Sequence, residues 1–229
     1  MRWECNKTGY SGLVEGGGEG VIKVENVQVW GFEHAIRGMR NPLQSHSKSD
    51  SGLRASGEHF ENVDFVIGPN DLELIKKLTK AGSEHRKCLR QIFVSMDITA
   101  PFFVWKQIDT YKVGTVANSC STMHKLTAKE FSIEDFTVDG MSPAGVLWLK
   151  DVVDGLNQAR ELYLESKSKN LWRDMICMLP ESYNQRRTMT MNYENVLNII
   201  HQRSNHKLSE WHTFCDALKR LPYIKELIE

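Results

Sequence analysis

The cysteines of this sequence are too scattered for a disulfide framework or a zinc site. The five of them, Cys5, Cys88, Cys120, Cys177 and Cys215, never form a Cys-x-x-Cys motif, which is the usual mark of a structural zinc site. Long apolar runs are also lacking: no segment approaches the roughly 20 residues of a membrane helix, and the polar N-terminus has no signal-peptide core. We therefore expect a cytoplasmic protein with no metal ion and no membrane contact.

An excess of charge of either sign is missing as well. Lys and Arg total 29 residues, and Asp and Glu total 29. Without a net positive field the protein is not drawn to a nucleic-acid polymer, so any anionic ligand must be held locally. The common catalytic fingerprints are also missing: there is no Gly-x-Gly-x-x-Gly after a strand, no Walker loop, and no His-Glu-x-x-His or Gly-x-Ser-x-Gly sequence. These absences exclude the simplest enzyme assignments.

Composition and local pattern predict one domain of the α+β class. The chain has 229 residues, of which 41% are hydrophobic and 25% charged, and this suits a single globular domain with a sizeable core. Residues 1–20 are polar and rich in glycine, so we expect a flexible N-terminal arm followed by one domain at 21–229. Helices occur around a few strands without alternating βαβ units, which indicates α+β.

Residue spacing predicts the elements in chain order. Alternation of apolar and polar residues predicts strands, and apolar spacings of three and four predict helices. Asn70 or Asp71 is expected to cap a helix that Gly82 ends, and Pro143 opens a long amphipathic helix. The predicted strands are 21–30 and 92–99; the predicted helices are 32–39, 70–81, 85–90, 101–108, 142–166 and two or three more within 171–228; segments 44–58 and 113–124 are predicted to be irregular.

A late segment, MNYENVLNIIHQR, places polar side chains at helical spacing. Asn192, Asn195 and Asn198 lie three residues apart, and Gln202 and Arg203 follow near the end of the same edge. Asparagine is a mediocre helix former that both donates and accepts hydrogen bonds, so several on one helix suggest a ligand-binding edge. The alternative is a solvated polar face opposite the apolar residues. The pattern alone leaves both interpretations open.

A second candidate site lies where the helix after Pro101 enters an irregular segment. Gln107, Thr110, Tyr111 and Lys112 stand at this point. A helix end that opens into a loop is a common ligand site, although these four residues also suit an ordinary helix end.

Two single residues are further candidates. Cys120 lies in the same irregular segment, and its thiol is either a nucleophile or a passive small side chain. His85 follows a glycine closely and is either a ligand or base, or a partly exposed residue at a helix start.

The order of segments resembles that of the flavin-dependent thymidylate synthases (ThyX). The run LELIKKLTKAGSEHRKCLRQIFVSMDITAPFFVWKQIDTYKVGT is similar to the centre of that family, where a helix leads into Gln-x-x-Arg-His-Arg and then Ser-x-Asn-Glu-x-Ser-x-Arg. Gln107 matches the glutamine, and Thr115 matches the first serine. Thr110, Tyr111 and Lys112 stand in place of Arg-His-Arg, and Ala117, Asn118, Cys120 and Thr122 stand in place of the asparagine, glutamate, second serine and arginine.

The C-terminal part matches more closely. LPESYNQRRTMTMNYENVLNIIHQR is similar to the family's Leu-Pro followed by a Thr-x-Asn helix, in which two asparagines approach the flavin and an arginine binds the nucleotide. Asn192, Asn198 and Arg203 take these three positions, while Ile176 stands where another nucleotide-binding arginine is expected. The resemblance covers about residues 21–220.

The resemblance implies helices packed around a small mixed or antiparallel sheet, and usually a homotetramer with FAD held between subunits. In this family reduced flavin transfers a one-carbon unit from methylenetetrahydrofolate to C5 of dUMP, with NADPH as the reductant. The cofactor supplies most of the chemistry. The implied roles are cofactor binding for His85, Thr110, Tyr111, Lys112, Asn192 and Asn198, nucleotide binding for Gln107, Asn118, Cys120 and Arg203, and catalysis for Gln107 and Cys120.

The missing arginines leave the substrate and the activity open. A nucleotide phosphate prefers charge-assisted hydrogen bonds, each worth roughly 1.5–3 kcal/mol. Either Lys112, Arg173, Arg186 or Arg187 substitutes, or the substrate differs; Asn118 in place of a glutamate would suit another base, as in dCMP. The sequence also fits a non-catalytic flavin- or nucleotide-binding protein, or a helical interaction module without a small ligand.

Overall fold

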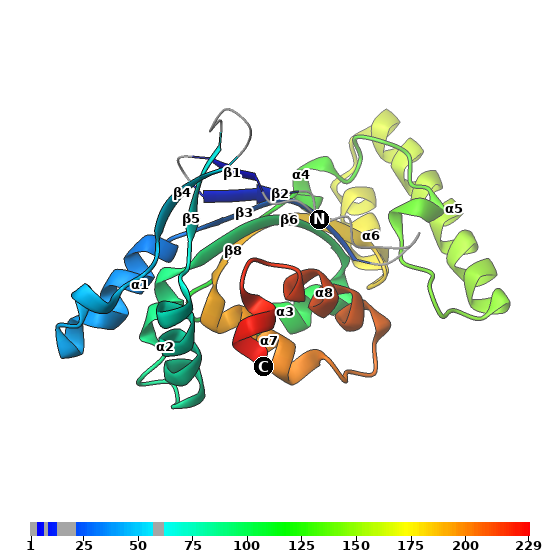
Figure 1. The fold of residues 1–229 in the computed structure, drawn as a ribbon. Coiled ribbons are helices and arrows are strands. Elements are labelled where there is room, and N and C mark those ends of the chain that lie inside the picture. The colour runs from blue at the N-terminus through cyan, green and yellow to red at the C-terminus, as the bar shows by residue number, and fades with distance from the viewer. Residues whose placement is uncertain (1–3, 7–8, 13–21, 57–61) are drawn as a thin grey trace.

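The centre of the molecule is a curved antiparallel sheet with strand order β1-β2-β3-β6-β8-β7 (Figure 1). The computed structural model describes residues 4–6, 9–12, 22–56 and 62–229. Each neighbouring pair of strands in the sheet is antiparallel, and β4 and β5 form a separate antiparallel hairpin. The strands are β1 Glu4–Asn6, β2 Gly9–Gly12, β3 Lys23–Trp30, β4 Gly52–Ser56, β5 Asn62–Val66, β6 Phe93–Pro101, β7 Val116–Ser119 and β8 Asn184–Asn192.

Helices lie beneath the sheet and on both sides of it. In Figure 1, α3, α7 and α8 lie below the sheet, α1 and α2 lie at the left, and α5 and α6 form a pair at the right. No helix in the described part of the chain is both long and apolar enough to cross a bilayer. The α-helices are α1 Phe32–Arg40, α2 Pro69–Lys80, α3 Phe102–Ile108, α4 Thr122–Lys125, α5 Pro143–Ser166, α6 Lys169–Met178, α7 Tyr193–Arg203, α8 Ser209–Lys219 and α9 Ile224–Ile228; the 3-10 turns are η1 Asn41–Leu43, η2 His46–Lys48, η3 Lys87–Gln91 and η4 Ile133–Asp135.

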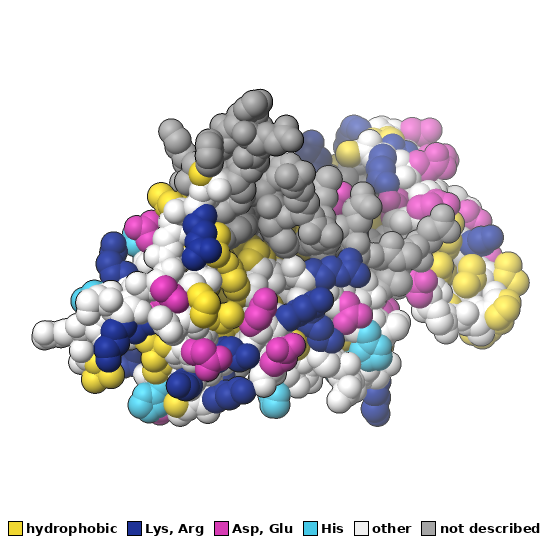
Figure 2. Space-filling view, in the orientation of Figure 1, with side chains coloured by type: hydrophobic (Ala, Val, Ile, Leu, Met, Phe, Trp, Pro, Cys, Tyr) yellow, Lys and Arg dark blue, Asp and Glu magenta, His cyan; other side chains and the backbone are white. Residues whose placement is uncertain are grey.

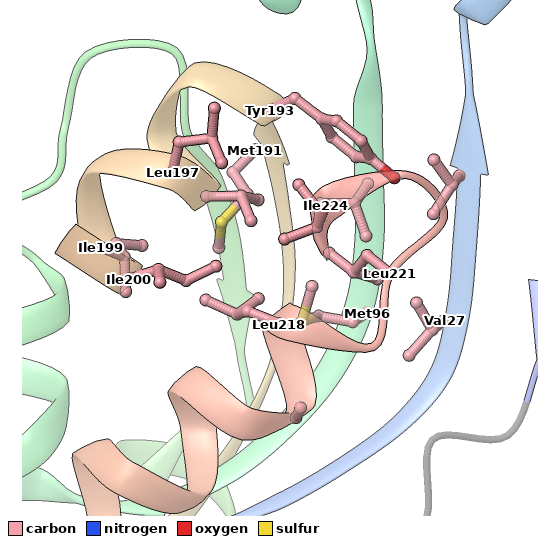
Figure 3. Close-up of a cluster of buried hydrophobic side chains, with 14 of the residues drawn as sticks. Val27, Met96, Met191, Tyr193, Leu197, Ile199, Ile200, Leu218, Leu221 and Ile224 are labelled. Atoms are coloured by element: carbon pink, nitrogen blue, oxygen red, sulfur yellow. The ribbon is translucent and has the colours of Figure 1, made fainter. Parts of the chain in front are cut away.

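The main core fills the space between the sheet and the helices below it. Met96 and Ile98 of β6 are buried while the residues that alternate with them are partly exposed, which is the period of two that a strand with one buried face requires. Figure 3 shows Met96 and Met191 of the sheet beside Leu197 of α7 and Leu218 of α8. The end of β8 and the start of α7 are therefore fixed by packing on the same core.

A second, smaller core lies under α5. Leu149, Val153 and Leu156 are spaced four and three residues apart, so they share one face of α5, and they pack with Met175 of α6 and Phe136. The predicted long amphipathic helix is confirmed, including its start at the predicted proline. These two helices form a pair with its own apolar contacts beside the sheet.

The predicted α+β class is confirmed, and the sheet is antiparallel. The strands predicted at 21–30 and 92–99 are β3 and β6, and the helices predicted at 32–39 and 101–108 are α1 and α3. The helix predicted at 85–90 is instead the 3-10 turn η3. The period of the apolar residues is therefore sufficient to identify elements that pack on the main core.

Three strands lie where the sequence predicts something else. β8 lies within 171–228, where only two or three helices are predicted, and β4 and β7 lie in the two segments predicted to be irregular. All residues of β7 are exposed, so backbone pairing with β8 defines that strand without any apolar alternation. β8 is held between β6 and β7, and such long-range pairing overrides local preference.

Part of the predicted N-terminal arm forms strands. β1 pairs with β2, and β2 pairs with β3. For these residues the prediction of an arm that does not pack is wrong, because backbone hydrogen bonds to a neighbouring strand need no apolar spacing. The rest of the predicted arm, residues 1–3, 7–8 and 13–20, lies outside the described residues.

The start of α2 also differs from the prediction, since neither of the two residues expected to cap it does so. The carboxylate of Asp50 accepts hydrogen bonds from the first backbone N–H groups of the helix instead. Asp71 is buried and accepts from Arg40 Nε at 2.7 Å and from Ser51 Oγ at 2.6 Å. Burial raises the pKa of Asp71, but hydrogen bonds from Ser51, Ser49 and Arg40 outweigh it and leave the pKa below its ordinary value. Asp71 therefore ties α1 and the segment before β4 to α2.

Candidate functional site

Five side chains from three helices and the segment after α3 form a connected group, which we call the Trp211 cluster: Gln107, Tyr111, Gln202, Arg203 and Trp211. Trp211 Nε1 donates to Gln107 Oε1 at 2.8 Å. Arg203 Nε donates to the hydroxyl of Tyr111 at 3.0 Å, and that hydroxyl donates to Gln202 Oε1 at 2.9 Å. The end of α3, the last turn of α7 and the start of α8 therefore meet through polar contacts.

Aromatic rings support the guanidinium of this cluster. The central carbon of the Arg203 guanidinium lies 4.8 Å from the centroid of the Trp211 ring and 5.8 Å from that of Tyr111. Trp211 itself is fully buried. A guanidinium stacked on a buried indole keeps its charge while its orientation is fixed.

Two groups of the cluster are left as free donors. Within the described residues, the terminal nitrogens of Arg203 make no hydrogen bond or ion pair, and Nε2 of Gln107 makes no hydrogen bond. Both side chains are only partly exposed. Partly buried polar groups normally find partners, so this arrangement suits an acidic or carbonyl-bearing ligand.

The asparagines of the same segment hold the loop that follows α3. Asn192 is the last residue of β8, and its Oδ1 accepts from the backbone N–H of Asn195 at 3.0 Å, which caps α7. Asn195 Nδ2 donates to the carbonyl of Val113 at 2.7 Å. Gly114 has φ +78°, and a Cβ there would lie 2.5 Å from Asn192 Nδ2. Because Asn192 and Asn195 are both buried, the interpretation as a solvated polar face is wrong for these two residues.

Asn198 belongs to a different contact group. Its Oδ1 accepts from Arg86 Nη2 at 3.2 Å, and Arg86 Nε donates to Glu194 at 3.0 Å. Arg90 also donates to Glu194, at 2.5 Å, and hydrogen bonds from Arg90 and Arg86 hold the pKa of Glu194 below its ordinary value. These bonds join α7 to the turn before β6.

The same turn forms one wall of a cavity of about 820 Å³. His85, one of the predicted cofactor residues, lines it together with Lys48 and Lys87. Neither lysine makes an ion pair within the described residues, whereas Arg40, also in the lining, is paired with Asp71. The volume lies in the range of small-molecule sites. The full lining is Gly38, Met39, Arg40, Asn41, Pro42, Leu43, Gln44, Ser45, Ser47, Lys48, Leu74, Leu78, Glu84, His85, Lys87, Cys88 and Gln91.

The remaining predicted site residues are exposed. Asn118 lies on the edge strand β7, opposite Thr188 of β8, and Cys120 follows that strand. Thr110 donates its hydroxyl to the carbonyl of Gln107 at 2.7 Å, and Lys112 is exposed. Within the described residues, the side chains of Asn118 and Cys120 make no hydrogen bond to the Trp211 cluster.

Two of the arginines considered as replacements are already paired. Arg186 donates to Asp97 at 2.6 Å. Arg187 donates to Asp109 at 2.9 Å, and its guanidinium lies 4.3 Å from the centroid of the Trp105 ring. Figure 2 shows the same mixture on one face, where Lys and Arg side chains lie among Asp and Glu. Arg186 therefore joins β8 to β6, and Arg187 joins β8 to the end of α3, so both are poor candidates for a phosphate.

Lys112 and Arg173 make no ion pair within the described residues, so both remain available to a phosphate. Of these, Lys112 directly follows Tyr111 of the Trp211 cluster. No group of three or more His, Cys, Asp or Glu side chains in the described part of the chain could hold a metal ion.

Sequence reasoning does not identify Trp211 or Arg86 as site residues. Each acts through a partner more than 100 residues away in the chain, since Trp211 bonds to Gln107 and Arg86 bonds to Asn198. A local pattern carries no signal for such a contact. In the sequence, Trp211 is marked only by its place within residues 21–220, the part of the chain that resembles the family.

Comparison with known proteins gives one family and one fold. The family described as "Thymidylate synthase complementing protein" matches residues 34–222. No curated protein matches the chain.

Two solved structures from Helicobacter pylori share the fold. The flavin dependent thymidylate synthase ThyX complexed with FAD and dUMP is 19% identical, with a TM-score of 0.68 over 88% of this chain and 97% of that chain. Another structure of ThyX with FAD and dUMP is also 19% identical, with a TM-score of 0.67 over 89% of this chain and 100% of that chain.

Proposed function

The chain belongs to the thymidylate synthase complementing protein family, and from this membership we propose that it is a flavin-dependent thymidylate synthase that converts dUMP to dTMP. The presence of FAD and dUMP in both similar Helicobacter pylori structures supports this choice of cofactor and substrate. The proposal includes methylenetetrahydrofolate as the one-carbon donor, NADPH as the reductant, a homotetramer, and a place in the cytoplasm.

The observation that carries the proposal is the pair of free donors in the Trp211 cluster. Gln107 and Arg203 match the family's nucleotide-binding positions, and the structure places them in one group, joined through Trp211. Their free N–H groups bind oxygen atoms of the nucleotide. Lys112 adds a positive charge beside the cluster, which partly replaces the missing arginines.

The cavity lined by His85 fits the anionic part of FAD. Its lysines are unpaired within the described residues, and positive side chains without carboxylate partners suit a pyrophosphate. Asn198 is held by Arg86, the residue next to His85, so the predicted flavin-binding edge of α7 is joined to the wall of this cavity. When bound, FAD supplies the redox and one-carbon transfer chemistry.

Asn192, Thr110, Tyr111, Asn118 and Cys120 complete the proposed site. Asn192 and Tyr111 position the loop after α3 and the Arg203 guanidinium. Thr110, Asn118 and Cys120 are exposed, and exposure suits side chains that meet the ligand across a subunit boundary.

Absorption of the purified protein and tritium release from C5-labelled dUMP test the proposal. We expect a yellow protein with a flavin spectrum and release of tritium from dUMP in the presence of methylenetetrahydrofolate and NADPH, with C5-labelled dCMP in parallel. A colourless protein that takes up no added FAD would refute it. A yellow protein that binds dUMP but releases tritium from neither nucleotide would favour a non-catalytic binding protein, which the substituted loop suggests.

Arg203→Ala tests the nucleotide site directly. The variant should lose at least tenfold in dUMP affinity, because one charge-assisted contact is worth roughly 1.5–3 kcal/mol, while FAD affinity changes little. Arg54→Ala, which removes an exposed arginine on β4, is the control and should bind both ligands as the unmodified protein does. Equal loss of both ligands in Arg203→Ala would contradict its assignment to the nucleotide.

A further inference from the structure

The orientation of the Gln107 amide is decided by Trp211. Oxygen and nitrogen of an amide are hard to distinguish by shape, so their assignment depends on the partners. The indole N–H of Trp211 can only donate, and it lies 2.8 Å from the near end of the amide. That end must be the oxygen, because the reverse orientation would set two donors against each other in a partly buried position.

The outward end of Gln107 is therefore an NH₂ group. Within the described residues it donates to nothing, and the neighbouring Arg203 guanidinium, stacked on the same indole at 4.8 Å, can also only donate. We propose that Trp211 is a positioning residue that makes Gln107 and Arg203 a donor-only pair, so that this site accepts an oxygen-bearing edge of the nucleotide and rejects an amino group.

This inference rests on the proposed function and selects among its substrates. Uracil presents the acceptor O4 where cytosine presents a donor N4 amino group. Phosphate oxygens are acceptors as well. If the pair contacts the base, a donor-only site favours dUMP over dCMP, the alternative substrate suggested by Asn118 in place of a glutamate. If the pair contacts the phosphate, dUMP and dCMP both bind and deoxyuridine, which has no phosphate, does not.

Trp211→Phe is the direct test. It keeps an aromatic ring at this buried position and removes the indole N–H, so the Gln107 amide is free to turn; because Phe is also smaller than Trp, loss of packing must be controlled for separately. Trp172→Phe is the matched control, because Trp172 of α6 also donates its indole N–H, to the carbonyl of Met123 at 3.2 Å, but packs on the second core. Binding of dUMP, dCMP and deoxyuridine to FAD-loaded protein is measured by calorimetry, and the flavin spectrum and thermal unfolding show whether each variant is folded.

The expected result is a change in selectivity. The unmodified protein should prefer dUMP to dCMP by about tenfold or more, as one mismatched buried hydrogen bond requires, and Trp211→Phe should shrink that preference while Trp172→Phe keeps it. Should the pair meet the phosphate, Trp211→Phe weakens dUMP and dCMP equally and leaves deoxyuridine unchanged. A folded Trp211→Phe that binds all three compounds as before would overturn the inference and leave the proposed function standing. Unmodified protein that binds no nucleotide would overturn both.

A second variant tests the donor role of Gln107 without removing the buried ring of Trp211. Gln107→Glu keeps an oxygen for the Trp211 N–H but turns the outward group into a negatively charged acceptor. We expect it to lose dUMP binding by more than Trp211→Phe does, with an unchanged flavin spectrum. A dUMP affinity equal to that of the unmodified protein would contradict the donor role of the outward amide.

Discussion

Replacing Gly114 by alanine tests whether Asn192 fixes the loop that follows α3. Gly114 has φ +78°, and an L residue with a side chain pays about 1–2 kcal/mol in this region. The more restricted unfolded chain of the alanine variant offsets about 0.4–1 kcal/mol of that cost. Backbone strain alone should therefore lower the free energy of unfolding by roughly 1 kcal/mol.

The contact with Asn192 adds a second contribution. The new Cβ would lie 2.5 Å from Asn192 Nδ2, so the amide or the loop must move. Movement of the amide breaks the cap of α7, worth about 1 kcal/mol, and movement of the loop breaks the hydrogen bond from Asn195 to Val113, also worth about 1 kcal/mol. We therefore expect Gly114→Ala to lose about 2 kcal/mol in total.

Gly140→Ala separates the two contributions. Gly140 has φ +72°, but a Cβ there meets no atom within 4 Å, so only the backbone strain applies. Equilibrium unfolding in urea, followed by far-UV circular dichroism, should show Gly114→Ala to be less stable than Gly140→Ala by about 1 kcal/mol. Equal destabilisation of the two variants would refute the role given to Asn192.

Three more perturbations follow from the polar contacts of Asp97, Asp71 and Asn195. Hydrogen bonds, chiefly from Thr188, hold the pKa of Asp97 at about 2, against an ordinary value of 3.8; the depressed pKa stabilises the fold by about 2 kcal/mol above roughly pH 5, and this is lost as pH falls towards 2. Urea unfolding should therefore show Asp97→Asn to be less stable at pH 7 and close to the unmodified protein near pH 2, and a constant difference would contradict the pKa. Arg40→Met leaves the buried Asp71 carboxylate without its cation and should cost about 3–5 kcal/mol in thermal unfolding, whereas a loss below about 1 kcal/mol would place that pair among weak surface ion pairs. Asn195→Ala removes the bond to the loop after α3, so limited proteolysis should cut that loop faster, and an unchanged cleavage rate would show that the loop is held by different contacts.

The parts of the fold that the sequence predicts are those in which each residue's burial follows a local period. β6 alternates buried and partly exposed residues, and α5 carries its apolar residues at spacings of three and four, so both are visible without any tertiary information. β8 also alternates, with Met189 and Met191 buried, but the alternation is short and runs directly into α7. Pairing with β6 and β7 decides its structure, and a window of local sequence does not contain that information.

Capping shows a similar limit. An aspartate close to a helix start predicts a cap, yet Asp71 faces inward to Arg40, and Asp50 from the preceding segment takes over the free N–H groups. Which of two nearby carboxylates caps the helix depends on where the buried cation lies. That cation, on α1, is 31 residues away from Asp71 in the chain.

The candidate site also has a part that the sequence predicts and a part that only the structure shows. Gln107 and Arg203 are found one by one, through the resemblance to a family, but their relation is set by a single indole that bonds to one and stacks on the other. A resemblance transfers residue types to positions and does not transfer the direction in which an amide points. That direction is a property of the packed structure, because it follows from the donor that reaches the amide.

Ion pairs with aspartates also decide which basic side chains remain free to bind a phosphate near the segment after α3, where the family's arginines are missing. Arg186 and Arg187 lie near the loop, but each is paired with an aspartate that would lose its cation if the arginine turned to a ligand. Lys112 has no such commitment in the described structure and directly follows Tyr111, whose hydroxyl is held by Arg203. The number of basic residues in the sequence is therefore not the number available to a ligand. Near this loop, Lys112 and the terminal nitrogens of Arg203 make no ion pair within the described residues.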